Sequence, residues 1–158
     1  MTGAEFLRRI YELEDSIRCK EDEIQKIQAD MVHLKSVDTS KDRVDGGKPM
    51  DTADKIAKLL EVEESLNADW DELIKWREVA RSMISRMNNS LYKAVLMTRV
   101  VNHRSWPVVA GILHKSEDRT RHLYPLAVAE FEARVAELYP GYLDTIQIFQ
   151  KTAQNNHR

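Results

Sequence analysis

A regular repeat of apolar residues near the start of the chain constrains its fold more than any other feature. The repeat alternates steps of four and three residues over four heptads, and its apolar members are Phe6, Ile10, Leu13, Ile17, Ile24, Ile27, Met31 and Leu34. This spacing is the a/d pattern of a coiled-coil seam, so it predicts one long helix. Only Lys20 places a polar side chain in the series. We interpret Lys20 as a residue that sets the register of helix pairing rather than as a catalytic lysine.

A second repeat of the same kind follows a segment of turn-forming residues. Residues 36–51 show no periodicity and contain Asp45-Gly46-Gly47 and Pro49, which predicts a loop. The second helix is then expected to begin with Asp51 or Thr52 as its N-cap. Its apolar positions are Leu59, Val62, Leu66, Leu73, Trp76, Ala80, Met83 and Met87, and Asp69 is its polar position.

Two heptad helices joined by a loop predict an antiparallel hairpin. Neither helix can bury a full seam alone. We therefore also expect a homo-oligomer formed through residues 4–87.

Residues 89–138 are expected to form three short helices. The first is expected at Ser90–Val101 and is followed by the connector Asn102-His103-Arg104. Ser105 is expected to cap the second helix, whose buried side is predicted to comprise Val109, Ala110, Ile112 and Leu113. After a tight turn at His114-Lys115, Ser116 is expected to cap a third helix that extends to Leu138. Two helices separated by such a short turn predict a helix-turn-helix.

Pro125 lies within the predicted third helix. Proline removes one helical hydrogen bond and disfavours the helical conformation of the residue before it, at a cost of about 3 kcal/mol. The sequence therefore predicts either a kink near residues 121–125 or a new helix that begins at Pro125.

Together these patterns predict an all-α fold with three regions. Residues 1–88 are expected to form the coiled-coil hairpin and residues 89–138 the helix-turn-helix domain. Residues 139–158 are expected to form a short amphipathic C-terminal helix and a tail.

Charge is unevenly distributed between these regions. Residues 1–88 hold 15 Lys or Arg against 20 Asp or Glu, a net charge of −5. Residues 89–138 hold 7 Lys or Arg against 5 Asp or Glu, a net charge of +2, and also contain three histidines. The basic groups that could contact an anion are therefore concentrated in the helix-turn-helix region.

The run Arg99-Val100-Val101-Asn102-His103-Arg104-Ser105-Trp106 resembles a motif of phage proteins, with the pattern R-Y-L-N-G-K-[ST]-W. Val109-Ala110, Ser116 and Ala127-Val128 continue the likeness at matching spacing. On these residues the chain resembles the ArpU/RinA-like regulators of phage late-gene transcription, whose C-terminal part is similar to region four of sigma factors. His103 and His114 stand where that family usually has glycine, so we expect them at turn positions with positive φ.

The resemblance implies a DNA-binding protein whose third helix enters the major groove. The residues after the cap that are then expected to face the groove are Glu117, Arg119, Thr120 and Arg121, with Tyr124 as a further candidate. Ser116 caps this helix, Ser105 is expected near a phosphate, and Arg104 and Lys115 are expected to contact the DNA backbone. Trp106 is expected to brace the two helices. The expected partners are double-stranded DNA and, by analogy with sigma factors, host RNA polymerase.

The sequence contains no convincing catalytic or cofactor-binding motif, so we expect no catalytic site, cofactor, metal or small-molecule substrate. Gly46-Gly47-Lys48 lacks the context of a phosphate-binding loop, and His114 and His122 lack companions for a zinc site. The single Cys19 cannot form an internal disulfide. No apolar run approaches the roughly 18 residues of a membrane span, and the first residues do not resemble a secretory signal. A cytoplasmic protein without membrane contact is therefore expected.

Two other functions share this architecture. The first is a protein-binding adaptor or inhibitor that keeps the helix-turn-helix only as a packing unit, which Glu117, Asp118 and Pro125 favour. The second is a small terminase-like DNA-packaging subunit. Composition alone does not separate these functions from transcription regulation.

Overall fold

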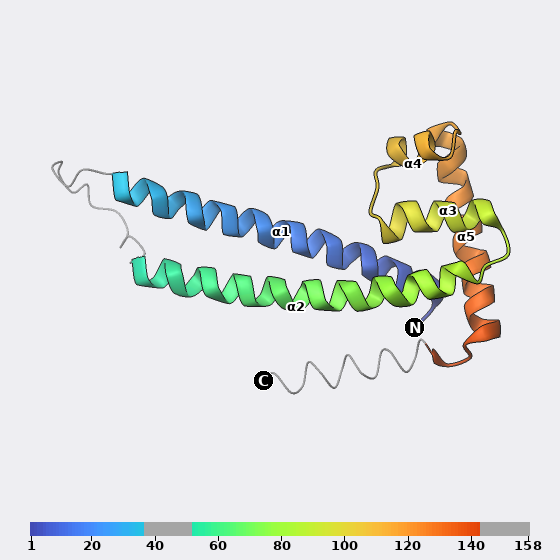
Figure 1. Ribbon diagram of the computed structural model, residues 1–158, viewed down its shortest axis with the longest axis horizontal. Coiled ribbons are helices and arrows are strands. Elements are labelled where there is room, and N and C mark those ends of the chain that lie inside the picture. Colours follow the sequence, from blue (N-terminus) through green and yellow to red (C-terminus); the bar gives the residue numbers. More distant parts are fainter. Residues whose placement is uncertain (37–51, 143–158) are drawn as a thin grey trace. The chain divides into compact units, whose positions relative to one another are not determined.

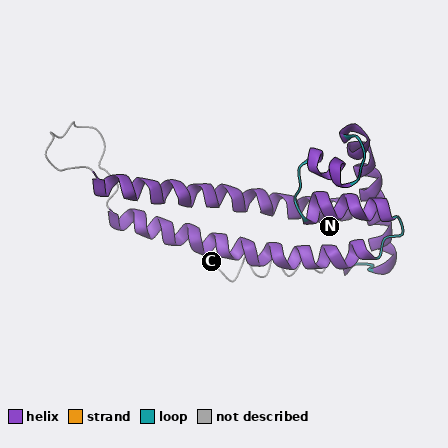
Figure 2. Ribbon diagram, turned by 45° about the horizontal axis from the view of Figure 1, so that its top comes forward, coloured by secondary structure: helices purple, strands orange, loops and turns teal. Residues whose placement is uncertain are grey.

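The computed structural model describes residues 1–36 and 52–142, and this part of the chain contains helices and no strand (Figures 1 and 2). The elements are α1 (Gly3–Ser36), α2 (Thr52–Ser85), α3 (Ser90–Leu96), the π-helix η1 (Met97–Val101), α4 (Trp106–Ile112) and α5 (Glu117–Leu138). A long α1–α2 hairpin followed by shorter helices confirms the predicted all-α class. The predicted loop, the cap at Asp51 and the predicted C-terminal helix beyond residue 142 lie outside the described residues. None of the described helices is both long and apolar enough to cross a membrane.

The described residues fall into two compact units. One comprises residues 15–72, which are the adjoining parts of α1 and α2. The other comprises residues 1–14 together with the described residues from 73 onward. This grouping reflects which residues pack together and does not set the boundary of a functional region, so the three predicted regions stay a prediction.

Within the unit of residues 15–72, the two polar positions of the predicted seam meet each other. The ammonium of Lys20 lies 2.7 Å from Oδ2 of Asp69 and donates a hydrogen bond of 2.6 Å to Oγ of Ser65. The hydroxyl of Ser16 donates to the same Asp69 oxygen at 2.8 Å. A polar pair at one level of a seam is satisfied in only one register, which is the physical basis for the role predicted for Lys20.

The apolar seam of this unit is only partly covered by the helix pair. Ile17 is buried, whereas the other apolar seam residues of the unit whose side chains are described are half-buried: Ile24, Ile27, Met31, Leu59, Val62 and Leu66. Val32 and Leu60 are 67% and 59% exposed. The helix pair of this unit therefore leaves apolar surface in contact with water.

The second unit has a continuous core to which every helix contributes. The ring of Phe6 in α1 lies 4.8 Å from that of Trp76 in α2 and 6.2 Å from that of Phe131 in α5, measured between centroids. Other buried residues of this core are Leu7, Ile10, Leu13, Leu73, Ala80, Met83, Ile84, Met87, Val95, Leu96, Val100, Val101, Val109, Ala110, Leu123, Ala127 and Val135. The apolar periodicity seen in the sequence thus identifies most of the core.

A carboxylate from α5 fixes the turn between α2 and α3. Oε1 of Glu130 accepts hydrogen bonds from the backbone N–H groups of Asn88 and Asn89, at 2.9 and 3.0 Å. The side chain of Asn89 in turn accepts from the N–H groups of Leu91 and Tyr92 at the start of α3. These bonds satisfy donors that a helix start leaves without helical partners.

Of the two alternatives predicted at Pro125, a new helix is wrong, because α5 continues through this residue from Glu117 to Leu138. The predicted kink stays a prediction. Pro125 lies on the exposed side of α5, where water can replace the missing hydrogen bond. Leu123 and Ala127 on either side of it are buried. Packing of the buried face therefore keeps the helix in one piece.

Candidate nucleic-acid interface

The predicted turn between α4 and α5 closes as a Schellman motif. The N–H of His114 donates to the carbonyl of Gly111 at 3.2 Å, and the N–H of Lys115 donates to that of Ala110 at 3.0 Å. These are the two bonds that define this helix ending, in which the residue after the C-cap takes a left-handed conformation. His114 has a φ of 51°, so the expected positive φ is confirmed.

His103 ends the preceding helix in a related way, with a φ of 48°. The N–H of Asn102 donates to the carbonyl of Met97, and the N–H of Arg104 donates to that of Thr98 at 3.1 Å. The second bond spans one residue more than in an ordinary Schellman ending, because the chain leaves a π-helix. Both histidines therefore take the left-handed conformation expected of glycine positions.

The two predicted helix caps behave differently. Oγ of Ser116 accepts a hydrogen bond from the N–H of Arg119 at 3.2 Å, which confirms Ser116 as the cap of α5. Ser105 occupies the N-cap position of α4, and its carbonyl accepts from the N–H of Val109 at 3.0 Å. The Ser105 hydroxyl makes no capping bond, so it contributes an exposed polar group rather than a cap.

Thr120 does not face outward, and this part of the predicted site is wrong. Its side chain is fully buried, and its hydroxyl donates to the carbonyl of Ser116 at 2.9 Å. Thr120 precedes the buried Leu123 by three residues and Ala127 by seven, which places all three on one face of the helix. A residue on this face cannot reach DNA without leaving the core.

Ile112 was also expected to be buried, but its side chain is 52% exposed. Val109 and Ala110 form the buried side of α4. Ile112 lies two residues beyond Ala110, which turns its side chain about 200° around the helix from that residue. The exposed Ile112 and Val108 are four residues apart and so share the outer face of α4.

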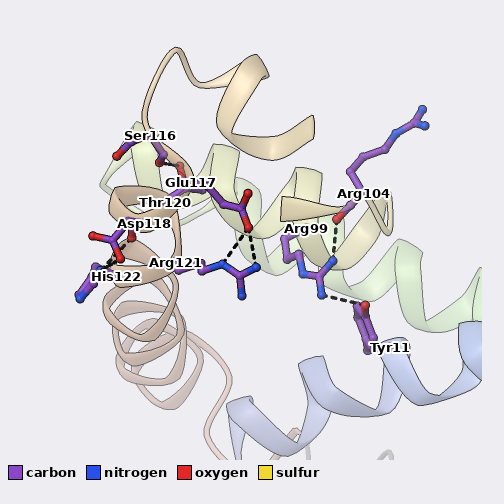
Figure 3. A network of polar contacts seen from close by, with 9 residues as sticks. All are labelled: Tyr11, Arg99, Arg104, Ser116, Glu117, Asp118, Thr120, Arg121 and His122. Atoms are coloured by element: carbon purple, nitrogen blue, oxygen red, sulfur yellow. Dashed lines mark hydrogen bonds and ion pairs between the residues drawn. The ribbon is translucent and has the colours of Figure 1, made fainter. Parts of the chain in front are cut away.

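The two arginines predicted to lead DNA contact differ in their surroundings. Arg121 is held by Glu117, whose Oε1 lies 2.5 Å from Nη2 and 3.1 Å from Nε of the guanidinium (Figure 3). The Arg121 guanidinium also lies 5.4 Å from the centre of the Trp106 ring. Arg119 is exposed, and its side chain makes no ion pair with any described residue. Arg119 is therefore the more accessible of the two cations.

Lys115 and Arg104 complete the set of predicted cationic contacts, and both are exposed. In Figure 3 the Arg104 side chain extends away from the other labelled residues, while its backbone carbonyl points toward Arg99. The structure thus leaves the side chains of Arg104, Lys115 and Arg119 exposed around the helix-turn-helix.

Sequence analysis missed a cluster that surrounds Arg99. Nη1 of Arg99 donates to the carbonyl of Arg104 at 2.7 Å, and Nη2 donates to the hydroxyl of Tyr11 at 2.8 Å. The guanidinium lies over the rings of both Tyr11 and Trp106, at 4.7 and 4.6 Å from their centroids. We call Tyr11, Arg99, Trp106 and the Arg104 carbonyl the arginine clamp. The only advance signal for it was that Arg99 and Trp106 are the two ends of the recognised motif.

Further aromatic contacts extend the arginine clamp toward α5. Trp106 meets the ring of Tyr124 edge to face at 5.5 Å, which confirms that it braces α4 against α5. Burial raises the pKa of the Tyr124 hydroxyl, although the Arg99 charge opposes this shift. The ring of His103 lies 4.1 Å from that of Tyr11. The arginine clamp therefore joins α1, η1, the connector and α4, and Tyr124 links it to α5.

Within residues 1–36 and 52–142, no group of three His, Cys, Asp or Glu side chains is placed to hold a metal ion. A family model described as a protein of unknown function, DUF1492, matches residues 33–129. The chain belongs to this family. The DUF1492 match includes α2, the connector, α4 and most of α5, and so contains Arg99 and Trp106 but not Tyr11. No curated protein and no solved structure matches the chain.

Proposed function

We propose that this DUF1492 protein is a DNA-binding transcriptional regulator of phage or prophage origin. The observation that carries the proposal is the α4–turn–α5 unit, which has a Schellman turn, a capped second helix and exposed cations around it. In helix-turn-helix proteins the second helix enters the major groove with its first residues against the bases. The likeness to ArpU/RinA-like regulators over residues 99–128 supports the same function.

The exposed cations have complementary tasks in this proposal. Arg119, near the start of α5, can donate to the O6 and N7 atoms of guanine or to a phosphate. Lys115 and Arg104 flank α4 and suit phosphate contacts, which position a protein on DNA without selecting sequence. Double-stranded DNA is thus the expected partner.

The ion pair between Arg121 and Glu117 is weak enough to be exchanged for a phosphate contact. The two side chains are 54% and 41% exposed and are four residues apart on the helix. Exposed pairs of this kind contribute only about 0.3–0.5 kcal/mol, because water screens the attraction. Arg121 therefore stays in the proposed interface as a residue that changes partner on binding.

A dimer formed through the hairpin would present two copies of the helix-turn-helix. The half-buried seam and exposed Leu60 of residues 15–72 support self-association, since pairing with a second hairpin would cover them. Two copies match the two half-sites that helix-turn-helix dimers contact on DNA. Contact with host RNA polymerase belongs to the same proposal and rests on the likeness to sigma region four.

The decisive test is a binding titration of the full chain with random duplex DNA over a series of salt concentrations. Contact with about three phosphates per subunit gives a log–log slope near −2.7 per subunit. Arg119→Glu is expected to weaken binding at least about tenfold, because it replaces an attraction by a repulsion. Arg18→Glu, the same charge reversal at an exposed position of α1, is the matched control and should change affinity less than about twofold. Absence of binding at low salt, or equal effects of the two variants, would refute the proposal.

A protein-binding adaptor is the second candidate, and the outer face of α4 favours it. Val108 and Ile112 are 45% and 52% exposed there, and apolar side chains grouped on a surface are typical of protein contacts. Occupation of Arg121 by Glu117 points the same way. This function predicts no DNA binding in the titration, together with a protein partner whose binding is lost in Ile112→Asp.

A further inference from the structure

The connector between η1 and α4 is held in a conformation that its own sequence disfavours. His103 has a φ of 48°, a left-handed conformation that costs a non-glycine residue energy. Such a conformation persists where surrounding contacts enforce it. Three contacts do so here: the Arg104 N–H bonds the Thr98 carbonyl, Arg99 bonds the Arg104 carbonyl, and the Tyr11 ring packs on His103.

Arg99 is the centre of this arrangement. Its two terminal nitrogens donate in different directions, one to the connector and the other to α1, while its plane stacks against two rings. A lysine carries a single ammonium and could not reproduce both the fork and the stacking. Because these contacts within the chain already engage both terminal nitrogens of the half-buried guanidinium, Arg99 is badly placed to bind a phosphate itself.

We infer that Arg99 and Tyr11 are positioning residues for the proposed DNA-binding site. They fix the backbone of Arg104 and thereby the direction from which its exposed side chain and the start of α4 meet a phosphate. The inference rests on the proposed function, and it adds residues that do not touch DNA. It also gives α1 a role in DNA binding, because Tyr11 lies in this helix. Tyr11 lies 88 residues before Arg99 and outside the region matched by the family model.

The test is a double-mutant cycle between Tyr11→Phe and Arg104→Ala in the full chain, with random duplex DNA as the probe. Tyr11→Phe keeps the ring and removes only the hydroxyl that accepts from Arg99. Loss of one hydrogen bond of typical net strength predicts DNA binding about 3–10-fold weaker. Arg104→Ala is expected to weaken binding of the unmodified chain by a similar factor, but less than about twofold when Tyr11→Phe is already present. Tyr92→Phe, at a half-buried tyrosine of α3, is the matched control and should leave affinity unchanged.

A second measurement does not depend on DNA. Hydrogen exchange of the Arg104 amide, which bonds the Thr98 carbonyl, should become at least about fivefold faster in Tyr11→Phe and stay unchanged in Tyr92→Phe. Unchanged exchange in Tyr11→Phe would overturn the inference.

The titration separates the remaining outcomes. If the unmodified chain binds DNA but the effects of Tyr11→Phe and Arg104→Ala simply multiply, positioning is refuted and the proposed function stands. If the unmodified chain does not bind DNA, the proposed function fails and the DNA-binding part of the inference fails with it. The exchange rates then still decide whether the arginine clamp holds the connector.

Discussion

The approach of α1 to α5 can be tested with a single methyl group at Gly3. A β-carbon there would lie 2.7 Å from Cγ of Glu132, 3.1 Å from Cδ1 of Phe131 and 3.2 Å from Cα of Glu132. The last of these atoms is backbone and cannot turn aside. Gly111 in α4 is the matched control, because a β-carbon there would meet no heavy atom within 4 Å. The same substitution therefore adds a methyl group once into a packed contact and once into open space.

The two variants are expected to change stability in opposite directions. Alanine is favoured over glycine inside a helix by about 0.5–1 kcal/mol, so Gly111→Ala should stabilise the protein by about that amount. Crowding a packed contact costs about 1–3 kcal/mol, so Gly3→Ala should destabilise it by about 1–2 kcal/mol after the smaller helix gain in a first turn is subtracted.

Urea unfolding followed by tryptophan fluorescence measures this difference. Trp76 is a suitable reporter because it is 5% exposed and packs against Phe6 in the same core. With a urea dependence of about 2 kcal/mol/M, the Gly3→Ala midpoint should fall by roughly 0.5–1 M. A Gly3→Ala midpoint equal to or above that of the unmodified chain, alongside a raised midpoint for Gly111→Ala, would show that α1 does not pack closely on α5.

Three further predictions follow from individual contacts. Lys20→Met should destabilise the hairpin by about 1–2 kcal/mol in thermal denaturation, because the carboxylate of Asp69 would stay half-buried without its cation. Adding Asp69→Leu to this variant should restore most of the lost stability, because no unpaired charge then remains. Burial raises the pKa of the Tyr124 hydroxyl, so the folded protein favours its neutral form. The stability that this preference contributes is fully present below the usual tyrosine pKa of about 10 and is lost as pH rises through the higher pKa of the folded state. Unfolding midpoints between about pH 8 and pH 11 should therefore fall less for Tyr124→Phe than for the unmodified chain. Glu117→Gln should tighten DNA binding about twofold more than Asp118→Asn does in a DNA titration. Both substitutions remove one negative charge, but only Glu117 forms an ion pair with an arginine, Arg121. Equal gains in affinity for the two variants would contradict this reasoning.

The sequence predicted the features that depend on neighbours a few residues apart. The hairpin follows from apolar residues at heptad spacing, and the two polar positions, Lys20 and Asp69, pair as a register device requires. The Ser116 cap bonds a residue three positions away, and the left-handed turns at His103 and His114 close through local backbone bonds. Such interactions recur wherever the same local pattern occurs, so they can be inferred before the fold is known.

Sequence analysis did not predict correctly which way every side chain faces around its helix, and it did not predict the contacts between distant segments. Thr120 was expected in the groove because it follows the cap, yet the packing of α5 turns it into the core. The bond between Tyr11 and Arg99 joins residues 88 positions apart, and the stack of Phe6 on Phe131 joins the two ends of the described chain. Local periodicity fixes which residues share a helix face but not which other helix that face will meet. Only the folded chain decides this, because the partner of each face is set by how all the helices bury their apolar surface at once.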